Sequence, residues 1–285
     1  MHDTLIRPRR SLIFAPGNHP DMYPKAAKAG ADIVTIDLED AIAPQHKEIA
    51  RDATLELTTS FAPADEVETI VRVNCLRTVE GLADLQAIAS AEVPPSALML
   101  PKIKSADEIQ VYDELLSGPL SHIRFHVIIE TNEALESCHR IARCSPRIDS
   151  LLFGGVDMAA ELRVEPIWDA LLYARSRVVH AAAGAGLDFI DVPFLDLSDM
   201  DGLEREASAC RKLGITGKAA IHPKQIPVIN KIFTPTSEDI DLARRITTEF
   251  EQGDSGLVVI DNKLIEKPVL RSMYRILAIA ERLRL

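Results

Sequence analysis

The stretches RFHVIIE (124–130) and SLLFGG (150–155) decide the fold class of this chain. Each is a short, mostly apolar run rich in Val, Ile, Leu and Phe, which is typical of a parallel strand buried on both faces. The segment between them is long enough for a crossover helix. Together they predict one strand–helix–strand unit of a parallel sheet.

Similar runs lie on either side of this unit: SLIFAP (11–16), DIVTIDL (32–38), ETIVRVN (68–74), ALMLPK (97–102), DFIDVP (188–193) and KAAIHP (218–223). Helix patterns alternate with them, and no long low-complexity linker interrupts the series. A doubly wound nucleotide-binding sheet would need a GxGxxG turn after its first strand, but the sequence has Pro16-Gly17-Asn18 there. The alternation therefore predicts a closed TIM (β/α)₈ barrel.

The chain continues beyond the eighth unit. GLVVI (256–260) and KLIE (263–266), separated by Asp261-Asn262, predict a tight β-hairpin, and an amphipathic helix follows Pro268. We therefore expect a barrel core at residues 1–235. A helix, hairpin and helix extension at 236–285 would pack on the barrel or on a neighbouring subunit.

The composition, 47% hydrophobic and 26% charged over 285 residues, is that of an ordinary globular protein. A net charge of −11 argues against a duplex nucleic-acid partner, which would require clustered Lys and Arg. No apolar run approaches the ~20 residues of a membrane span. No signal-peptide pattern follows the basic N-terminus, and the four cysteines form no CxxC pair, so we expect reduced thiols and a cytoplasmic protein.

Polar residues follow the predicted strands at the end that faces the active site of a barrel. Singly, each has a structural explanation: a strand-end Asp is often a helix cap, Lys102 could form half of an ion pair, and His222 could be a satisfied loop histidine. Collectively they favour a functional site, because random surface charge would not gather at one end of consecutive strands. The residues are Asp37, Glu39, Asp40, Arg72, Asn74, Lys102, Glu130, Asp157 and His222.

Glu130 and Asp157 are the most informative pair. Two carboxylates from adjacent strand ends, with no Cys or His nearby, suit a hard cation such as Mg²⁺. Gly155 and its neighbour Gly154 would allow backbone amides to approach a bound carboxylate. Arg72 offers a bidentate guanidinium for the same carboxylate. Together these groups predict a pocket for a small α-keto acid.

Seven motifs give the chain a family resemblance. In order along the sequence they are RRSLIFAPG (9–17), DLEDA (37–41), VRVN (71–74), LPK (100–102), IET (129–131), FGGVD (153–157) and GKAAIHPKQ (217–225). With these motifs the chain resembles the citrate lyase β-subunit and HpcH/HpaI aldolase superfamily, on its acyl-CoA lyase branch. The match covers almost the whole chain. It is highly specific for the superfamily and far less specific for the substrate.

The resemblance implies a homotrimeric or hexameric barrel in which Glu130 and Asp157 hold Mg²⁺. Arg72 would bind the keto-acid carboxylate, with Lys102 and Gly155 in the same substrate site. The resemblance also implies that Glu39 and Asp40 lie near the metal and order its water molecules, as catalytic residues. Arg10 and Lys25 are the candidates for binding the phosphates of coenzyme A.

One position departs from the family pattern. Malyl-CoA and citramalyl-CoA lyases carry a catalytic aspartate in a C-terminal segment that is often delivered to a neighbouring subunit, and Glu266 stands at that position here. Glutamate can still do acid/base work, but ~1 Å of misplacement can be costly. Either the pocket has shifted to suit Glu266, or the activity differs from that of the typical lyase.

The sequence thus predicts a Mg²⁺-dependent carbon–carbon lyase that cleaves citramalyl-CoA, malyl-CoA or citryl-CoA to acetyl-CoA and a keto acid. The β-subunit of a citrate lyase complex, which uses an acyl-carrier protein, is the nearest alternative. Two other classes stay open: a class II pyruvate aldolase that needs no coenzyme A, and a non-catalytic barrel that binds a keto acid within a complex. A thioesterase side activity is also compatible with the sequence.

Overall fold

The computed structural model describes residues 7–60, 67–252 and 257–285, apart from the side chain of Ser60. The chain divides into two compact units, one formed by Arg9–Lys231 and the other containing Ile232–Leu285. The larger unit is the barrel. The smaller unit holds the hairpin and the last two helices.

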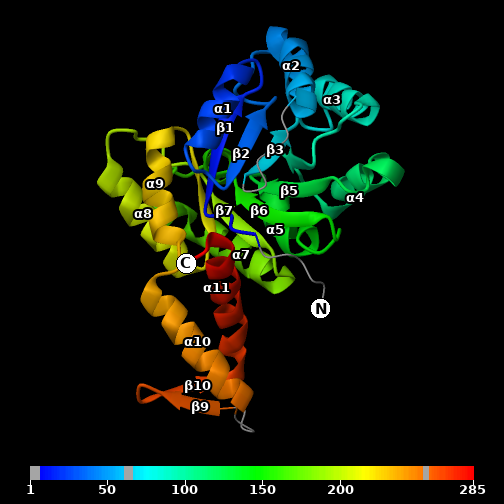
Figure 1. The fold of residues 1–285 in the computed structure, drawn as a ribbon. Helices are drawn as coiled ribbons and strands as arrows, with labels where there is room; N and C mark the ends of the chain where they lie inside the picture. The colour runs from blue at the N-terminus through cyan, green and yellow to red at the C-terminus, as the bar shows by residue number, and fades with distance from the viewer. Residues whose placement is uncertain (1–6, 61–66, 253–256) are drawn as a thin grey trace. The chain divides into compact units, whose positions relative to one another are not determined.

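Eight parallel strands form a closed barrel in the order of the sequence, which confirms the predicted fold class. They lie at the centre of the larger unit, with its helices outside them (Figure 1). The strands are β1 (Ser11–Pro16), β2 (Ile33–Asp37), β3 (Glu68–Arg72), β4 (Ala97–Leu100), β5 (Arg124–Ile129), β6 (Ile148–Phe153), β7 (Asp188–Asp191) and β8 (Gly217–Ala220).

A helix follows each strand of the barrel, and β6 is followed by two. They are α1 (Tyr23–Lys28), α2 (Lys47–Ser60), α3 (Val79–Ser90), α4 (Ala106–Leu115), α5 (Asn132–Ile141), α6 (Gly155–Leu162), α7 (Trp168–Ala185), α8 (Met200–Leu213) and α9 (Ile226–Phe233). Thr78, Ser105 and Thr131 cap the N-termini of α3, α4 and α5 through their side-chain oxygens. No helix in the described residues has both the length and the apolar character needed to cross a membrane.

The barrel is filled by apolar side chains rather than open. Successive strands each contribute buried residues to one cluster, and Phe14 packs against it. Such a filled interior is expected of a closed eight-stranded barrel. The cluster consists of Leu12, Ile33, Ile70, Ala97, Met99, Ile128, Leu152, Ile190 and Ala219.

The pairing of β1 with β8 closes the barrel. Leu12 lies opposite Ala219, and the Lys218 amide donates to the Arg10 carbonyl at 2.9 Å. Gly217 is required at this seam because a Cβ there would lie 2.0 Å from the carbonyl oxygen of Arg9. No side chain can be accommodated at that distance, so the glycine allows the two strands to approach.

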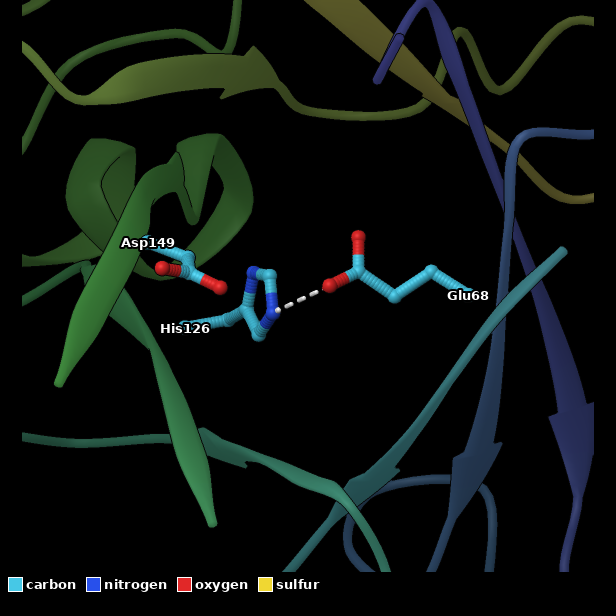
Figure 2. Close-up of side chains that lie close together, drawn as sticks. All are labelled: Glu68, His126 and Asp149. Carbon is cyan, nitrogen blue, oxygen red and sulfur yellow. Dashed lines mark ion pairs between the residues drawn. The ribbon is translucent and has the colours of Figure 1, made fainter. Parts of the chain in front are cut away.

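Arg9 binds the acids at the amino ends of three strands. Its guanidinium donates to Glu68 at 2.6 and 2.9 Å, to Asp149 at 2.9 Å and to Asp188 at 3.1 Å. His126 lies beside them, with Nε2 3.5 Å from Glu68 (Figure 2). This base network is almost wholly buried and ties β3, β6 and β7 to the segment before β1.

The smaller unit contains α10 (Ser237–Gln252), the strands β9 (Leu257–Ile260) and β10 (Lys263–Glu266), and α11 (Leu270–Leu283). The two strands are antiparallel and form the predicted hairpin, with Asp261 and Asn262 both at positive φ in its turn. Arg245 of α10 pairs with Asp261 at 2.8 Å. The predicted strand residue Gly256 lies outside the described residues.

Removing the charge of Glu68 tests the base network. Burial alone would raise the pKa of Glu68, but the Arg9 hydrogen bonds and His126 outweigh it and hold the pKa below its usual range. The carboxylate therefore stabilises the fold fully above the unfolded-state pKa of ~4.3, and this contribution fades only as pH falls further towards the depressed folded pKa. We expect Glu68→Gln to lower the free energy of unfolding by ~3–5 kcal/mol at pH 7, measured by urea denaturation.

The destabilisation should shrink in parallel measurements at successively lower pH, below about 4. Glu136→Gln is the matched control, because Glu136 is exposed and its pair with Arg177 at 3.2 Å should be worth at most ~1 kcal/mol. Equal unfolding midpoints for Glu68→Gln and Glu136→Gln at pH 7 would contradict the assignment.

Candidate active site

The carboxyl ends of the eight strands meet at one rim of the barrel, opposite the Arg9 network. Asp37 and Arg72 are the last residues of β2 and β3, and Glu130 directly follows β5. Asp157 lies in the first turn of α6, after β6. Local sequence explains these positions, because each polar residue comes where an apolar run ends and the chain turns outward.

The structure brings Glu130, Asp157 and Lys102 together. The Lys102 ammonium lies 2.5 Å from Asp157 Oδ2 and 3.7 Å from Glu130 Oε2. Glu130 is buried, whereas the Asp157 side chain is 44% exposed and open to incoming ligands. A single positive charge thus lies between the two carboxylates, in the position that suits a cation held by both.

The backbone of Lys102 is unusual. It has φ 54°, in the left-handed region that residues with a Cβ rarely adopt. This conformation directs the Lys102 amide to Glu130 Oε1 at 2.7 Å, while the ammonium of the same residue approaches Asp157. Such backbone outliers concentrate at functional sites.

Gly154 leaves the space that Glu130 occupies. A Cβ on Gly154 would lie 2.4 Å from Glu130 Cβ and 2.5 Å from Glu130 Oε2. A Cβ on Gly155 would lie 3.0 Å from Val192 Cγ1. The glycine pair predicted to admit a ligand carboxylate therefore allows close packing of the turn after β6 against Glu130 and of the start of α6 against Val192.

Arg72 is held by Asp37. Its Nε and Nη2 donate to the two carboxylate oxygens of Asp37 at 2.7 and 2.6 Å, and its Nη1 lies 3.1 Å from Glu39 and 3.7 Å from Asp40. Asp37 also accepts the Glu39 amide at 2.8 Å. The bidentate edge predicted for a substrate carboxylate faces Asp37 here, which leaves Nη1 as the group directed towards Glu39 and Asp40.

Two buried acids at this rim have raised pKa values. Burial raises the pKa of Glu39 to about 8, although Arg72 opposes the shift. Burial also raises the pKa of Glu130, against the opposing effect of Lys102. Glu39 Oε2 is buried without a hydrogen bond, despite its proximity to the Arg72 charge. Buried carboxylates with incomplete compensation fit a divalent cation, whose oxygen ligands they would become or whose water they would bind.

The remaining predicted residues make no contact with Glu130, Asp157 or Lys102 among the hydrogen bonds and ion pairs of the described residues. Lys25 is exposed on α1, which follows β1, and its ammonium is 3.3 Å from Asp21. Arg10 lies at the amino end of β1, where it pairs with Asp32 at 2.7 Å, so the structure does not bring it to the rim. Glu266 ends β10 in the smaller unit. His222 caps the turn after β8 by accepting the Lys224 amide at 3.1 Å.

A different metal-type group lies at the base. Within the described residues, Glu68, His126 and Asp149 are the one group of three or more His, Cys or acidic side chains with potential ligand atoms within 4.8 Å of one another (Figure 2). The Arg9 guanidinium already bonds both carboxylates of this group. A cation there would meet that fixed positive charge, so we interpret the group as part of the base network.

Sequence reasoning assigned no role to Asp191 and Lys218, which the structure pairs at 2.8 Å. Both are buried, and Asp191 also accepts from Arg175 at 2.8 Å. The sequence does show charged residues in these two short buried strands. The periodicity of a strand, however, does not indicate which residue neutralises its charge.

A filled parallel barrel with charged side chains gathered at its carboxyl rim is the architecture of (β/α)₈ barrel enzymes. The family model described as HpcH/HpaI aldolase/citrate lyase matches residues 10–223. The chain belongs to this family.

Individual relatives agree with that assignment. The mitochondrial citramalyl-CoA lyase of Rattus norvegicus is 31% identical, over 96% of this chain and 86% of its own length. A (3S)-malyl-CoA thioesterase of Cereibacter sphaeroides is 32% identical, over 96% and 95%. The structure of CitE from Mycobacterium tuberculosis in complex with magnesium, acetoacetate and coenzyme A superposes with a TM-score of 0.77 at 29% identity, covering 97% of this chain and 98% of that one.

Adding a methyl group at Gly154 tests the packing of Glu130. We expect Gly154→Ala to displace the Glu130 carboxylate and to weaken Mg²⁺ binding, measured by isothermal titration calorimetry, by roughly 10–100-fold. Gly184→Ala is the control. A Cβ at Gly184 would lie 2.7 Å from Arg143 Nη2, the flexible end of a side chain that can move away. The substitution should also stabilise the helix by ~1 kcal/mol, because Ala has a higher helix propensity than Gly. Equal Mg²⁺ affinity in the two variants would contradict this role of Gly154.

Proposed function

We propose that this chain is a Mg²⁺-dependent carbon–carbon lyase that cleaves a 3-hydroxy-carboxylate acyl-CoA to acetyl-CoA and a keto acid. The observation that carries the proposal is the position of the Lys102 ammonium between Glu130 and Asp157, at the carboxyl rim of a family barrel. The citramalyl-CoA lyase relative and the CitE complex with magnesium and coenzyme A support the substrate class.

Glu130 and Asp157 would hold the cation, and Lys102, which has space to move because its side chain is partly exposed, would yield that position. When bound, Mg²⁺ supplies a Lewis acid that lowers the pKa of the substrate hydroxyl. Glu39 and Asp40 would order its water molecules. Arg72 Nη1 and the amides around Gly155 would orient the carboxylate of the developing keto acid.

Cleavage needs two proton transfers. One group must accept the proton of the substrate hydroxyl while the carbon–carbon bond breaks and its electron pair moves to the thioester side. Glu39, buried at the rim beside Arg72, is the candidate for this step. A second carboxyl must donate a proton to the resulting carbanion to give the acetyl-CoA methyl group, and we assign this role to Glu266.

The thioester arm would cross the rim. Apolar side chains stand exposed after three consecutive strands: Val156 at 54%, Leu195 at 57% and Ile221 at 42%. They offer contacts for the uncharged part of the arm, and Lys25 offers a charge for a phosphate. The four cysteines are free, which supports a reducing compartment such as the cytoplasm.

A coupled assay of malyl-, citramalyl- and citryl-CoA tests the reaction. With Mg²⁺, wild type should release acetyl-CoA and the matching keto acid from at least one of them. Chelation with EDTA and the Glu130→Gln substitution should each lower kcat/KM by at least ~10²-fold, because both remove the cation from the site. Full activity in Glu130→Gln would show that the metal assignment is wrong.

Thioester hydrolysis is the second candidate, favoured by the malyl-CoA thioesterase relative. Product analysis separates the two reactions: a lyase gives acetyl-CoA and glyoxylate from malyl-CoA, whereas a thioesterase gives free coenzyme A and malate. Aldol cleavage of free hydroxy-keto acids would instead indicate the pyruvate aldolase alternative. Mg²⁺ binding without turnover would indicate a non-catalytic subunit.

We further propose that the chain forms a homotrimer or hexamer in which the hairpin reaches a neighbouring subunit. One face of the hairpin is apolar and exposed, with Leu257 at 47%, Val259 at 68% and Leu264 at 62%. Leu264 pairs with Val259, and Glu266 pairs with Leu257, so Glu266 belongs to the same face. An apolar face around a carboxylate supports docking that would deliver Glu266.

Solution mass and activity test this delivery. We expect a mass of three or six times 31.4 kDa by light scattering. Val259→Lys with Leu264→Lys should reduce both the mass and the activity, and Glu266→Gln should reduce the activity alone. Glu281→Gln, an exposed carboxylate of α11, is the control for Glu266→Gln. A monomer with full activity would contradict the proposal.

A further inference from the structure

A buried charge network lies between the barrel wall and two helices. Lys218, on β8, donates its three ammonium hydrogens to Asp191 Oδ2 at 2.8 Å, Glu206 Oε1 at 2.7 Å and the Val192 carbonyl at 2.7 Å. Arg175 of α7 donates to Asp191 Oδ1 at 2.8 Å. Lys218, Asp191 and Arg175 are at most 2% exposed.

The network is electrically balanced, since Lys218 and Arg175 offset Asp191 and Glu206. Burial would lower the pKa of Lys218, but Asp191 and the other acidic partners raise it above its usual value. The ammonium therefore stays protonated at physiological pH and has no free electron pair with which to attack a carbonyl. Its role is to hold other groups in place.

Two contacts lead from this network to the rim. The Val192 carbonyl is bound by Lys218, and the Val192 side chain packs against Gly155, where a Cβ would come within 3.0 Å. Arg175 Cζ lies 4.9 Å from the centroid of the Phe153 ring, and Phe153 is the last residue of β6. Both contacts therefore end on the turn formed by Gly154 and Gly155.

That turn positions the acid pair. Gly154 packs directly against Glu130, with space for no more than its hydrogen atom. Gly155 begins α6, whose first turn carries Asp157. A shift of Val192 or Phe153 would consequently move the two carboxylates relative to each other.

We propose that Lys218, with Asp191 and Arg175, is a positioning residue for the cation site: it fixes Val192 and thereby the separation of Glu130 from Asp157. This inference rests on the proposed Mg²⁺ function. The network, which lies between the barrel wall and two helices, would thereby influence how tightly the rim binds Mg²⁺. Groups that orient metal ligands without contacting the metal typically change metal affinity 10–100-fold.

The test separates positioning from stability. Lys218→Met alone leaves an unpaired buried charge and should destabilise the fold. Adding Glu206→Gln restores neutrality, because Arg175 and Asp191 remain paired. The double variant should unfold at a urea concentration closer to that of wild type than Lys218→Met does, yet bind Mg²⁺ at least 10-fold more weakly in isothermal titration calorimetry, because the Val192 carbonyl has lost its donor.

Val192→Ala provides a second route that keeps every charge of the network. It removes the contact with Gly155 and should also weaken Mg²⁺ binding, with kcat lowered more than KM is changed. Glu206→Gln alone is the control and should keep wild-type Mg²⁺ affinity. If the double variant does not fold, the result for Val192→Ala decides.

Wild-type Mg²⁺ affinity in either the folded double variant or Val192→Ala would overturn the positioning role. Absence of Mg²⁺ binding in the wild-type protein would instead overturn the proposed function on which it rests, so the two failures are distinguishable.

Discussion

The closure of the barrel between β1 and β8 is the constraint on which the rest of the structure depends. At this seam Gly217 admits the carbonyl of Arg9, and the Lys218 amide pairs with the Arg10 carbonyl. The same short segment supplies Arg9 to the acids at the base. Closure matters for function because it places all eight carboxyl ends on one rim, where residues from distant parts of the sequence can act together.

The two ends of the barrel differ in how far positive side chains neutralise their buried acids. At the base, Arg9 compensates its acids, and the pKa of Glu68 falls below its usual range despite burial. At the rim, Lys102 and Arg72 do not fully compensate their acids, and burial raises the pKa of Glu39 and of Glu130. Uncompensated buried acids cost stability, so their persistence at one end favours a role in binding a cation.

Much of the fold follows from local pattern. The eight strands could be located because buried parallel strands are short apolar runs, and the hairpin because Asp261-Asn262 tolerates the left-handed backbone of its turn. Pairing partners could not be located in this way. Arg72 was identified as a carboxylate-binding residue, but a neighbouring strand presents Asp37 to its bidentate edge. The pairing of Lys218 with Asp191 could not be predicted either, because the charges that neutralise the pair come from Arg175 of α7 and Glu206 of α8.

The sequence by itself determined the eight strand–helix units, the hairpin and the chemical identity of the acids at the strand ends, because each strand, turn and strand-end acid is recognised from residues close together along the chain. Only the tertiary structure decided which charges meet. Lys102 lies between Glu130 and Asp157, whereas Arg10 lies with Asp32 at the opposite end of its strand. The physical reason is that electrostatic interaction depends on distance in space, and barrel closure sets those distances between residues that are far apart in the sequence.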